Sequence, residues 1–284
     1  MKRDFLGELE TALPRISKRQ RILAEYILEN GGAAAYMTAA VLGQNAGVSE
    51  STVVRFAMSL GYRGYHQMQQ AFRESLRLRL TTVQRIEDAN DRMRDEDVID
   101  SVLLADADKI VSALHELDRS AFDRAIDILL SAKRIYIVGM RSSAILAQFM
   151  NYYLRLLFDN VSLVCPSGGS EVFEHLINLA PGDAVFAISF PRYSSGTVRA
   201  AEFAHRRGAG VIVLTDSAGS PIARNANVVL TAKSEMASFV DSLVAPMSII
   251  NAIIAYIGKK RPQEVAEKFR VLEDVWNEYK VYSE

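Results

Sequence analysis

Residues 134–143, RIYIVGMRSS, and residues 184–197, AVFAISFPRYSSGT, decide the fold. Each begins with a short run of apolar, partly β-branched residues, the predicted strands 134–138 and 184–188, that leads into serine and arginine. A continuously apolar run of this length is typical of a strand that is buried on both faces of a parallel sheet. Further runs of this kind lie at 161–164, 211–215 and 228–231. The pattern predicts a doubly wound α/β domain, with helices on both faces of a parallel sheet.

Helical periodicity fills the gaps between these strands. The expected helices cover residues 142–158, 170–179, 195–207 and 219–224. A long apolar helix is expected from Ser242 to Gly258. A last amphipathic helix has apolar residues at intervals of 4, 3, 4 and 3, namely Val265, Phe269, Leu272, Trp276 and Tyr279. Such a seam can pack on its own domain or on a partner, and both uses stay open.

The first 80 residues show helical patterns only. One helix is expected from the N-cap Ser17 to the glycines at 31–32, and another covers residues 66–80. Between them, residues 38–60 match a helix-turn-helix in their spacing. This part of the chain therefore predicts an all-α domain in front of the α/β domain.

Capping residues and glycines mark where the two helices of the predicted helix-turn-helix begin and end. Its first helix begins near Thr38 and buries Val41 and Leu42. Gly47 allows the tight turn, and Gly43 is small where the two helices cross. Its second helix starts at the N-cap Ser49, and the apolar residues at i, i+3, i+4 and i+7 form its inner face, namely Val53, Phe56, Ala57 and Leu60.

This inner face leaves Ser51, Thr52, Arg55 and Ser59 on the outer face. These residue types reach base edges and phosphates in DNA, and a helix N-terminus favours a phosphate. Basic residues on the first helix and after the third would contact the DNA backbone, or they are solvated surface charges. The predicted DNA-binding residues are Ser49, Ser51, Thr52, Arg55, Ser59, Arg63, Lys18 and Arg19.

The charge distribution supports a division of the chain. Residues 1–80 carry a net charge of +4 and residues 81–284 a net charge of −5, although the whole chain carries only −1. The predicted domains are a helix-turn-helix domain at 1–80, an acidic linker at 81–108 that is partly helical at its C-terminal end, and a ligand-binding domain at 109–284. A cationic domain on an anionic body favours a polyanionic partner for the first domain alone.

Loops rich in serine and glycine follow the predicted strands. Ligands of doubly wound sheets bind at the carboxyl ends of the strands, where backbone N–H groups and hydroxyls favour an anion. Arg141 and Arg192 strengthen this preference for phosphate or carboxylate. Taken singly, Ser167, Ser170 and Ser195 can equally be helix caps. The predicted ligand-binding residues are Gly139, Arg141, Ser142, Ser143, Ser189, Arg192, Ser194, Ser195 and Thr197.

The whole chain resembles the RpiR/MurR family of bacterial transcriptional regulators. The segments that carry the resemblance are Ser17-Lys-Arg-Gln-Arg21, Val48-Ser49 to Leu60-Gly61-Tyr62, and Asp241-Ser242-Leu243. The resemblance implies an N-terminal helix-turn-helix and a C-terminal sugar isomerase (SIS) domain that binds phosphosugars. It also implies operator DNA as the partner and a small anionic metabolite as the effector.

The sequence departs from that family in the ligand loops. The family's first loop usually reads Gly-x-Gly-x-Ser; here Gly139 and Ser143 fit, and Arg141 replaces the second glycine. The second loop usually reads Ser-x-Ser-Gly-x-Thr; here a longer form separates Ser189 from Thr197. We therefore expect Arg141 and Arg192 to select an effector with a carboxylate or an additional anionic group.

A SIS domain can also be an isomerase, and this is the alternative function. Sugar isomerisation needs a general base, for which Glu171, Glu174, His175 and His205 are available, but no pair of them points to catalysis. We expect no enzyme activity. No cofactor is expected, because Gly139 lacks the following glycines of a dinucleotide fingerprint. No metal site is expected, because the four histidines show no ligand spacing.

Two further expectations concern assembly and location. One recognition helix gives modest specificity, so two heads on paired half-sites, in a homodimer or homotetramer, are expected. The chain has a single cysteine, charges near its start, and an apolar stretch at 243–257 that is too short and too polar to span a membrane. We therefore expect a soluble, cytoplasmic protein without a membrane partner.

Overall fold

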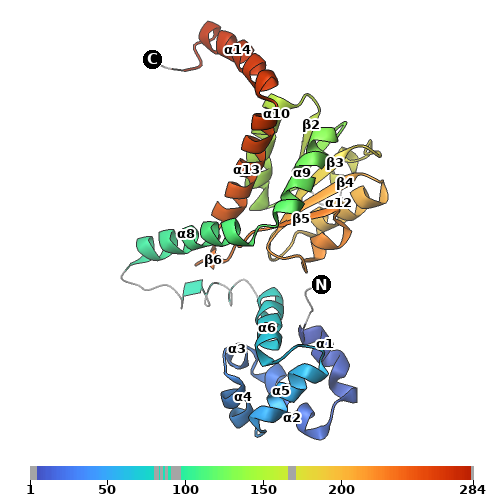
Figure 1. Ribbon diagram of the computed structural model, residues 1–284, viewed down its shortest axis with the longest axis vertical. Coiled ribbons are helices and arrows are strands. Elements are labelled where there is room, and N and C mark those ends of the chain that lie inside the picture. Colours follow the sequence, from blue (N-terminus) through green and yellow to red (C-terminus); the bar gives the residue numbers. More distant parts are fainter. Residues whose placement is uncertain are drawn as a thin grey trace. The chain divides into compact units, whose positions relative to one another are not determined.

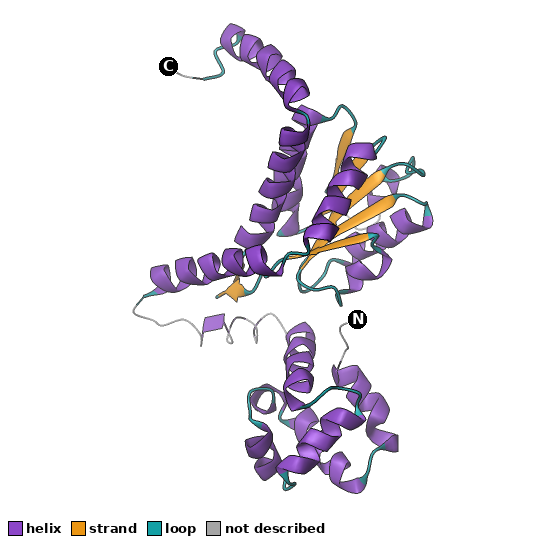
Figure 2. Cartoon of the chain, viewed as in Figure 1, coloured by secondary structure: helices purple, strands orange, loops and turns teal. Residues whose placement is uncertain are grey.

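The computed structural model describes residues 5–79, 83, 86, 89–90, 97–165 and 171–282. The chain divides into two compact units, Met1–Asp88 and Ala89–Glu284 (Figure 1). The first unit is helical over its described residues, and the second is built on a sheet (Figure 2).

The helices of the first unit begin where the sequence offers a cap. The Oγ atoms of Ser17 and Ser49 and the Oγ1 atom of Thr38 accept hydrogen bonds from the backbone at the starts of three helices, which confirms those predicted starts. The elements are α1 Phe5–Ala12, the 3-10 turn η1 Leu13–Arg15, α2 Lys18–Glu29, α3 Gly31–Ala34, α4 Ala39–Asn45, α5 Glu50–Ser59 and α6 Tyr65–Arg79.

Helix α1 was not expected, although it supplies much of the core of this unit. Phe5 and Leu9 are fully buried, and the ring of Phe5 lies 4.9 Å from the ring of Phe72 on α6, centroid to centroid. Tyr62 donates a hydrogen bond from its hydroxyl to Glu8 Oε2 over 3.1 Å. Helix α1 therefore completes the bundle around the helix-turn-helix.

Helices α4 and α5 cross at a glycine, as predicted. A Cβ atom on Gly43 would lie 2.9 Å from the carbonyl oxygen of Val48 and 3.2 Å from the backbone nitrogen of Glu50. Gly47 in the turn has a φ of +69°, which a residue with a side chain rarely adopts. Leu42 is buried as expected, whereas the expected burial of Val41 is wrong: it is 43% exposed, because it lies on the outer side of α4.

In the second unit, five parallel strands of the described chain form one sheet in the order β2-β1-β3-β4-β5. All five were predicted within one residue at each end, and the predicted α/β fold is confirmed. The strands are β1 Ile135–Gly139, β2 Val161–Val164, β3 Ala184–Ile188, β4 Gly210–Thr215 and β5 Val228–Thr231.

Helices cover both faces of this sheet (Figure 2). One face packs on α9, α10 and α13 through Phe122, Met150 and Ile253, and the other packs on α11 and α12 through Val172 and Ala201. The helices are α8 Val98–Glu116, α9 Arg119–Ser131, α10 Ser143–Leu157, α11 Glu171–His175, α12 Ser195–Arg206, α13 Val244–Lys260 and α14 Pro262–Glu278. The helix expected at 219–224 is the 3-10 turn η2 Pro221–Asn225, which begins at a proline.

A short antiparallel hairpin, β6 Met236–Ala237 and β7 Val240–Asp241, precedes α13 and was not expected.

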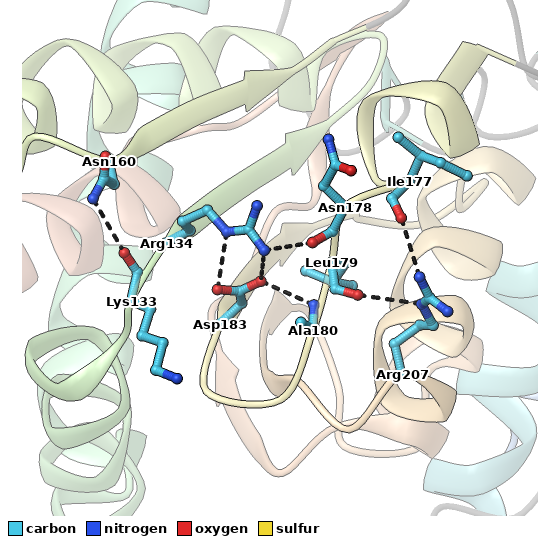
Figure 3. A network of polar contacts seen from close by, with 9 residues as sticks. All are labelled: Lys133, Arg134, Asn160, Ile177, Asn178, Leu179, Ala180, Asp183 and Arg207. Atoms are coloured by element: carbon cyan, nitrogen blue, oxygen red, sulfur yellow. Dashed lines mark hydrogen bonds and ion pairs between the residues drawn. The ribbon is translucent and has the colours of Figure 1, made fainter.

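At the amino end of the sheet, the buried carboxylate of Asp183 accepts from Arg134 (Nη2 at 2.8 Å) and from the backbone nitrogen of Ala180 (2.9 Å). Arg134 also donates to the carbonyl of Asn178, and these contacts fix the loop before β3 (Figure 3).

Candidate functional site

The N-terminus and outer face of α5 carry four of the eight residues predicted to bind DNA, namely Ser49, Ser51, Arg55 and Ser59. Ser51 and Arg55 are one helical turn apart and exposed, and Arg55 Nε donates to the carbonyl of Ser51 over 3.2 Å. Ser49 is exposed at the N-cap, where its Oγ lies 2.9 Å from Ser51 Oγ. A compact polar surface therefore forms at the N-terminus of α5, with one guanidinium beside it.

The expectation that Thr52 faces outward is wrong. It is only 6% exposed, and its Oγ1 lies 2.9 Å from Ser49 Oγ. Thr52 lies next to Val53 in the first turn of α5. Its side chain therefore faces the loop between α4 and α5 instead of solvent. Its hydroxyl supports the cap of α5.

The remaining predicted DNA-binding residues lie in two further places. Lys18 and Arg19 are exposed in the first turn of α2, and Arg63 is exposed after α5. Ser59 is exposed too, but its hydroxyl donates to the carbonyl of Phe56 (2.8 Å) and accepts from Gln20 Nε2 (3.1 Å). Because Gln20 belongs to α2, this contact brings the start of α2 next to the end of α5.

Gln20 is a residue that the sequence reasoning missed. It forms a capping box with Ser17, in which the Gln20 side chain accepts from the Ser17 backbone nitrogen over 3.1 Å. The spacing Ser-x-x-Gln at 17–20 was a visible signal for this motif.

The predicted ligand loops meet at the carboxyl end of the sheet. The chain passes from β1 to β2 on one side and to β3 on the other, so the sheet has its topological switch point between β1 and β3. Gly139 and Ile188, the last residues of these two strands, are paired in register. The loops at 140–142 and 189–194 therefore leave neighbouring strands at the place where doubly wound sheets bind ligands.

Both arginines of these loops have an unusual backbone. Arg141 has a φ of +57° and Arg192 a φ of +64°, and among the described non-glycine residues only Ser238 and Lys280 share a positive φ. A residue with a side chain in this region costs about 1–3 kcal/mol, and such residues cluster at ligand sites. Both arginines are exposed.

The two loops touch each other. Ser194 donates from its backbone nitrogen to Ser189 Oγ (3.2 Å) and from its hydroxyl to Met140 Sδ (3.1 Å). A Cβ atom on Gly196 would lie 2.7 Å from that same sulfur atom. Met140 was not expected at the site, and its contacts depend on a loop more than 50 residues away, so no local signal predicts them.

Two helices begin at these loops without a side-chain cap. Ser142 is the N-cap residue of α10 and Ser194 that of α12, and neither side chain makes a capping hydrogen bond. The first N–H groups of such helices have no partner within the helix and attract an anion. Ser143, Ser189 and Thr197 are buried, whereas Ser195 is exposed.

Thr197 presents an unsatisfied donor at the start of α12. Its Oγ1 is buried and has no hydrogen-bond partner in the described part of the chain. A buried hydroxyl without a partner costs about 1–3 kcal/mol. The loop at 166–170, which holds Ser167 and Ser170, lies outside the described residues.

Neighbouring side chains hold the loops in place. Tyr193 donates from its hydroxyl to Asp216 Oδ1 over 2.8 Å, and Ser142 donates to Asp241 Oδ2 over 3.1 Å. Cys165, at the end of β2, donates to the carbonyl of Gly139 over 3.0 Å. Burial raises the pKa of the Cys165 thiol.

Comparison with known proteins settles the family. A family described as "Helix-turn-helix domain, rpiR family" matches residues 4–78, and the SIS domain family matches residues 128–256. The HTH-type transcriptional regulator HexR of Escherichia coli (strain K12) is 32% identical over 233 residues, which cover 80% of this chain and 77% of HexR. The chain belongs to the RpiR family of transcriptional regulators. It is thus a DNA-binding regulator with a SIS domain.

Solved structures agree with this RpiR-family assignment. The sugar isomerase domain of an RpiR transcription factor from Sphaerobacter thermophilus has a TM-score of 0.58 at 28% identity, over 61% of this chain and 96% of that one. The Vibrio vulnificus NanR protein, solved with ManNAc-6P, has a TM-score of 0.58 at 20% identity, over 99% of this chain and 100% of that one. The latter likeness shows the fold.

Among the isomerase candidates of this RpiR-family regulator, His205 lies far from the ligand loops. Glu171, Glu174, His175 and His205 are all exposed. His205 lies ten residues along α12 from Ser195, which places it about 15 Å from the helix start at 1.5 Å per residue.

Over residues 5–79, 97–165 and 171–282 with the few described between them, no group of three His, Cys, Asp or Glu side chains could hold a metal ion. None of the helices described is long and apolar enough to cross a membrane. A groove of about 730 Å³ lies between α14 and the end of α10, beside Ile135 at the start of β1, and so at the opposite end of the sheet from the two loops.

Proposed function

We propose that this regulator binds a small anionic metabolite between the loops at 140–142 and 189–194, and that the bound ligand changes its affinity for operator DNA. The observation that carries the proposal is the pair of arginines, Arg141 and Arg192, with positive φ at the ends of adjacent strands. Backbone strain of this kind persists where the surrounding structure enforces it, and ligand sites are a common reason.

The proposed anion would lie between the starts of α10 and α12. Their first N–H groups carry the positive end of each helix dipole, and neither helix has a side-chain cap that competes for them. The buried hydroxyl of Thr197 adds a donor that still lacks a partner. Opening of the 189–194 loop would let a phosphate or carboxylate oxygen reach it.

The class of ligand follows from the donors and from the relatives. NanR of Vibrio vulnificus was solved with ManNAc-6P, a sugar phosphate, and its fold is the same. Two exposed guanidinium groups exceed what one phosphate requires, because each can bind an anion in a bidentate manner. A phosphorylated sugar acid, with a phosphate and a carboxylate, therefore fits the loops better than a neutral sugar.

On the DNA side, we propose that α5 enters the major groove with Arg55 and Ser51 toward the base edges. Ser49, Lys18, Arg19 and Arg63 would contact phosphates around it. Ser59 would contribute by fixing α2 against α5 through Gln20. Thr52 takes no direct part, because it is buried.

Calorimetry on the full chain tests the effector half of the proposal. The probes are 6-phosphogluconate, glucose 6-phosphate, gluconate and glucose, which carry both, one or neither of the two anionic groups. We expect affinity to fall in that order of lost charge and to drop about tenfold or more in Arg192→Ala, which removes a charged hydrogen bond. Arg199→Ala, an exposed arginine on α12, is the matched control. Equal affinity for the charged and neutral probes would refute an anion site.

Operator binding tests the other half. DNA selected in vitro with the wild-type chain provides the operator, and a gel shift with and without the tightest probe measures the coupling. Arg192→Ala should bind the operator as the wild type does and lose the response to the probe. A full response in that variant would remove Arg192 from the site.

A further inference from the structure

Helix α8 follows the helix-turn-helix unit in the chain, buries few apolar side chains and is held in part by polar contacts. Helix α8 begins at Val98, and its buried residue is a lysine, Lys109, at 8% exposure. Large apolar side chains on α8 are instead exposed, namely Ile99, Leu103, Leu104, Val111 and Leu114. A helix with so little apolar burial opens or shifts at low cost, so its position depends on its hydrogen bonds and ion pairs.

Those contacts come from two short segments of the SIS unit. Ser242 donates from its hydroxyl to Asp106 Oδ1 over 2.7 Å, and Lys109 Nζ lies 3.1 Å from the same oxygen. Lys233 Nζ donates to Ser112 Oγ (3.0 Å) and Glu116 Oε1 (2.8 Å). Asp106 is thus shared between a neighbouring cation on α8 and a hydroxyl from the segment before α13.

The residue before Ser242 contacts the ligand loop. Asp241, at the end of β7, accepts the hydroxyl hydrogen bond of Ser142 over 3.1 Å. Ser142 is the N-cap residue of α10 and follows Arg141 in the loop proposed to bind the effector. The contacts therefore run without a gap from the ligand loop, through Asp241 and Ser242, to Asp106 and Lys109 on α8.

We infer that Asp241 and Ser242 transmit effector binding to α8, an inference that rests on the proposed function. An anion bound at the start of α10 would accept the Ser142 hydroxyl that Asp241 now accepts, and it would stand beside the Asp241 carboxylate. Like charges at hydrogen-bonding distance repel, so the effector drives Asp241 away. Ser242 moves with it, because the two are adjacent in the chain, and Asp106 loses its bond.

Hydrogen exchange measured by mass spectrometry tests this coupling without any effector. We expect the amides of α8 between 102 and 113 to exchange about fivefold to tenfold faster in Ser142→Ala and Asp241→Asn, as the loss of one hydrogen bond predicts for an opening equilibrium. Neither residue lies on α8. Ser131→Ala is the matched control, because its hydroxyl caps only its own helix, bonding to Asp127. Faster exchange confined to the loop and the hairpin would overturn the inference.

Removal of the charge on Asp241 gives a second test, in which the affinity for the effector is expected to rise. In Asp241→Asn, 6-phosphogluconate should bind severalfold more tightly, because the repulsion is gone, while its effect on operator affinity disappears. Ser242→Ala lacks the bond to Asp106 from the start, so it should bind the operator with the affinity of the effector-bound wild type and also lose that effect. A normal operator response in both variants would overturn the inference and leave the effector site standing. If the probe binds neither wild type nor variants, the proposed ligand class fails, and the exchange of α8 alone decides the coupling.

Discussion

At the scale of single residues, neighbouring side chains on α5 show which buried positions the apolar spacing can predict and which it cannot. Apolar spacing correctly placed Val53, Phe56, Ala57 and Leu60 inside, because burial of these side chains dominates the packing of a short helix. The same pattern put Thr52 outside, which is wrong. A small hydroxyl residue has no strong preference of its own, so its direction is decided by the turn against which it lies, through its contact with Ser49.

Arg55 is the residue on which we expect operator specificity to depend. Arg55→Ala should weaken operator binding about tenfold to a hundredfold, because a bidentate arginine contact to a base is worth about 1–3 kcal/mol. Gel shifts at several salt concentrations measure it. Arg15→Ala, another exposed arginine of the same unit, controls for the lost charge. Similar losses in both variants would show that α5 contributes charge and does not read bases.

Cys165 reports on the ligand loop, because it is the single cysteine of the chain and bonds to the carbonyl of Gly139. Its raised pKa means that less thiolate is present at a given pH, and alkylation requires the thiolate. We expect alkylation by iodoacetamide at pH 8 to be slower in the folded chain than in urea, and its pH profile to lie at higher pH. Equal rates in the two states would contradict the pKa shift.

At the scale of elements, the strands were the most predictable part. Five apolar runs gave five strands within a residue, because burial on both faces leaves no polar alternative in the run. Helix α1 and the hairpin at 236–241 could not be found in this way. Residues 5–12 are helical because Phe5 packs on Phe72. The hairpin and the residue that follows it contact Ser142 and Asp106, which lie far away in the sequence.

The crossing of α4 and α5 is the element contact that a single substitution should break. Gly43→Ala places a Cβ atom 2.9 Å from the backbone oxygen of Val48, and backbone cannot move aside as a side chain can. We expect a loss of about 1–3 kcal/mol in stability and weaker operator binding. Gly32→Ala is the control, because no atom lies within 4 Å of its added Cβ. Thermal unfolding by circular dichroism compares the two, and equal melting temperatures would contradict a tight crossing.

At the scale of the whole molecule, the sequence divides the chain into a basic part and an acidic part, and the structure shows contacts within the second that the sequence does not reveal. The net charges of +4 for residues 1–80 and −5 for the remainder concentrate attraction for DNA on the first unit. In the second unit, the loop at 140–142 and α8 are linked by Ser142, Asp241 and Ser242. Composition could predict the division, whereas the link depends on contacts between distant residues and appears only in the fold.

The expected pairing of two DNA-binding heads predicts the layout of the operator. One α5 helix reaches only a few base pairs, so tight binding needs two half-sites about 10 base pairs apart, on one face of the DNA. We expect an insertion of about 5 base pairs between the half-sites to lower affinity at least tenfold, because it rotates one half-site to the far face by half a helical turn.

An insertion of about 10 base pairs returns the half-sites to the same face and should restore part of that affinity, as far as the linked heads can reach. Gel shifts on the three spacings, with a single half-site as reference, separate the possibilities. If the single half-site binds as tightly as the natural operator, the heads act independently. The effector could then alter binding only within one head, and a change in the spacing of two heads would be excluded as its mechanism.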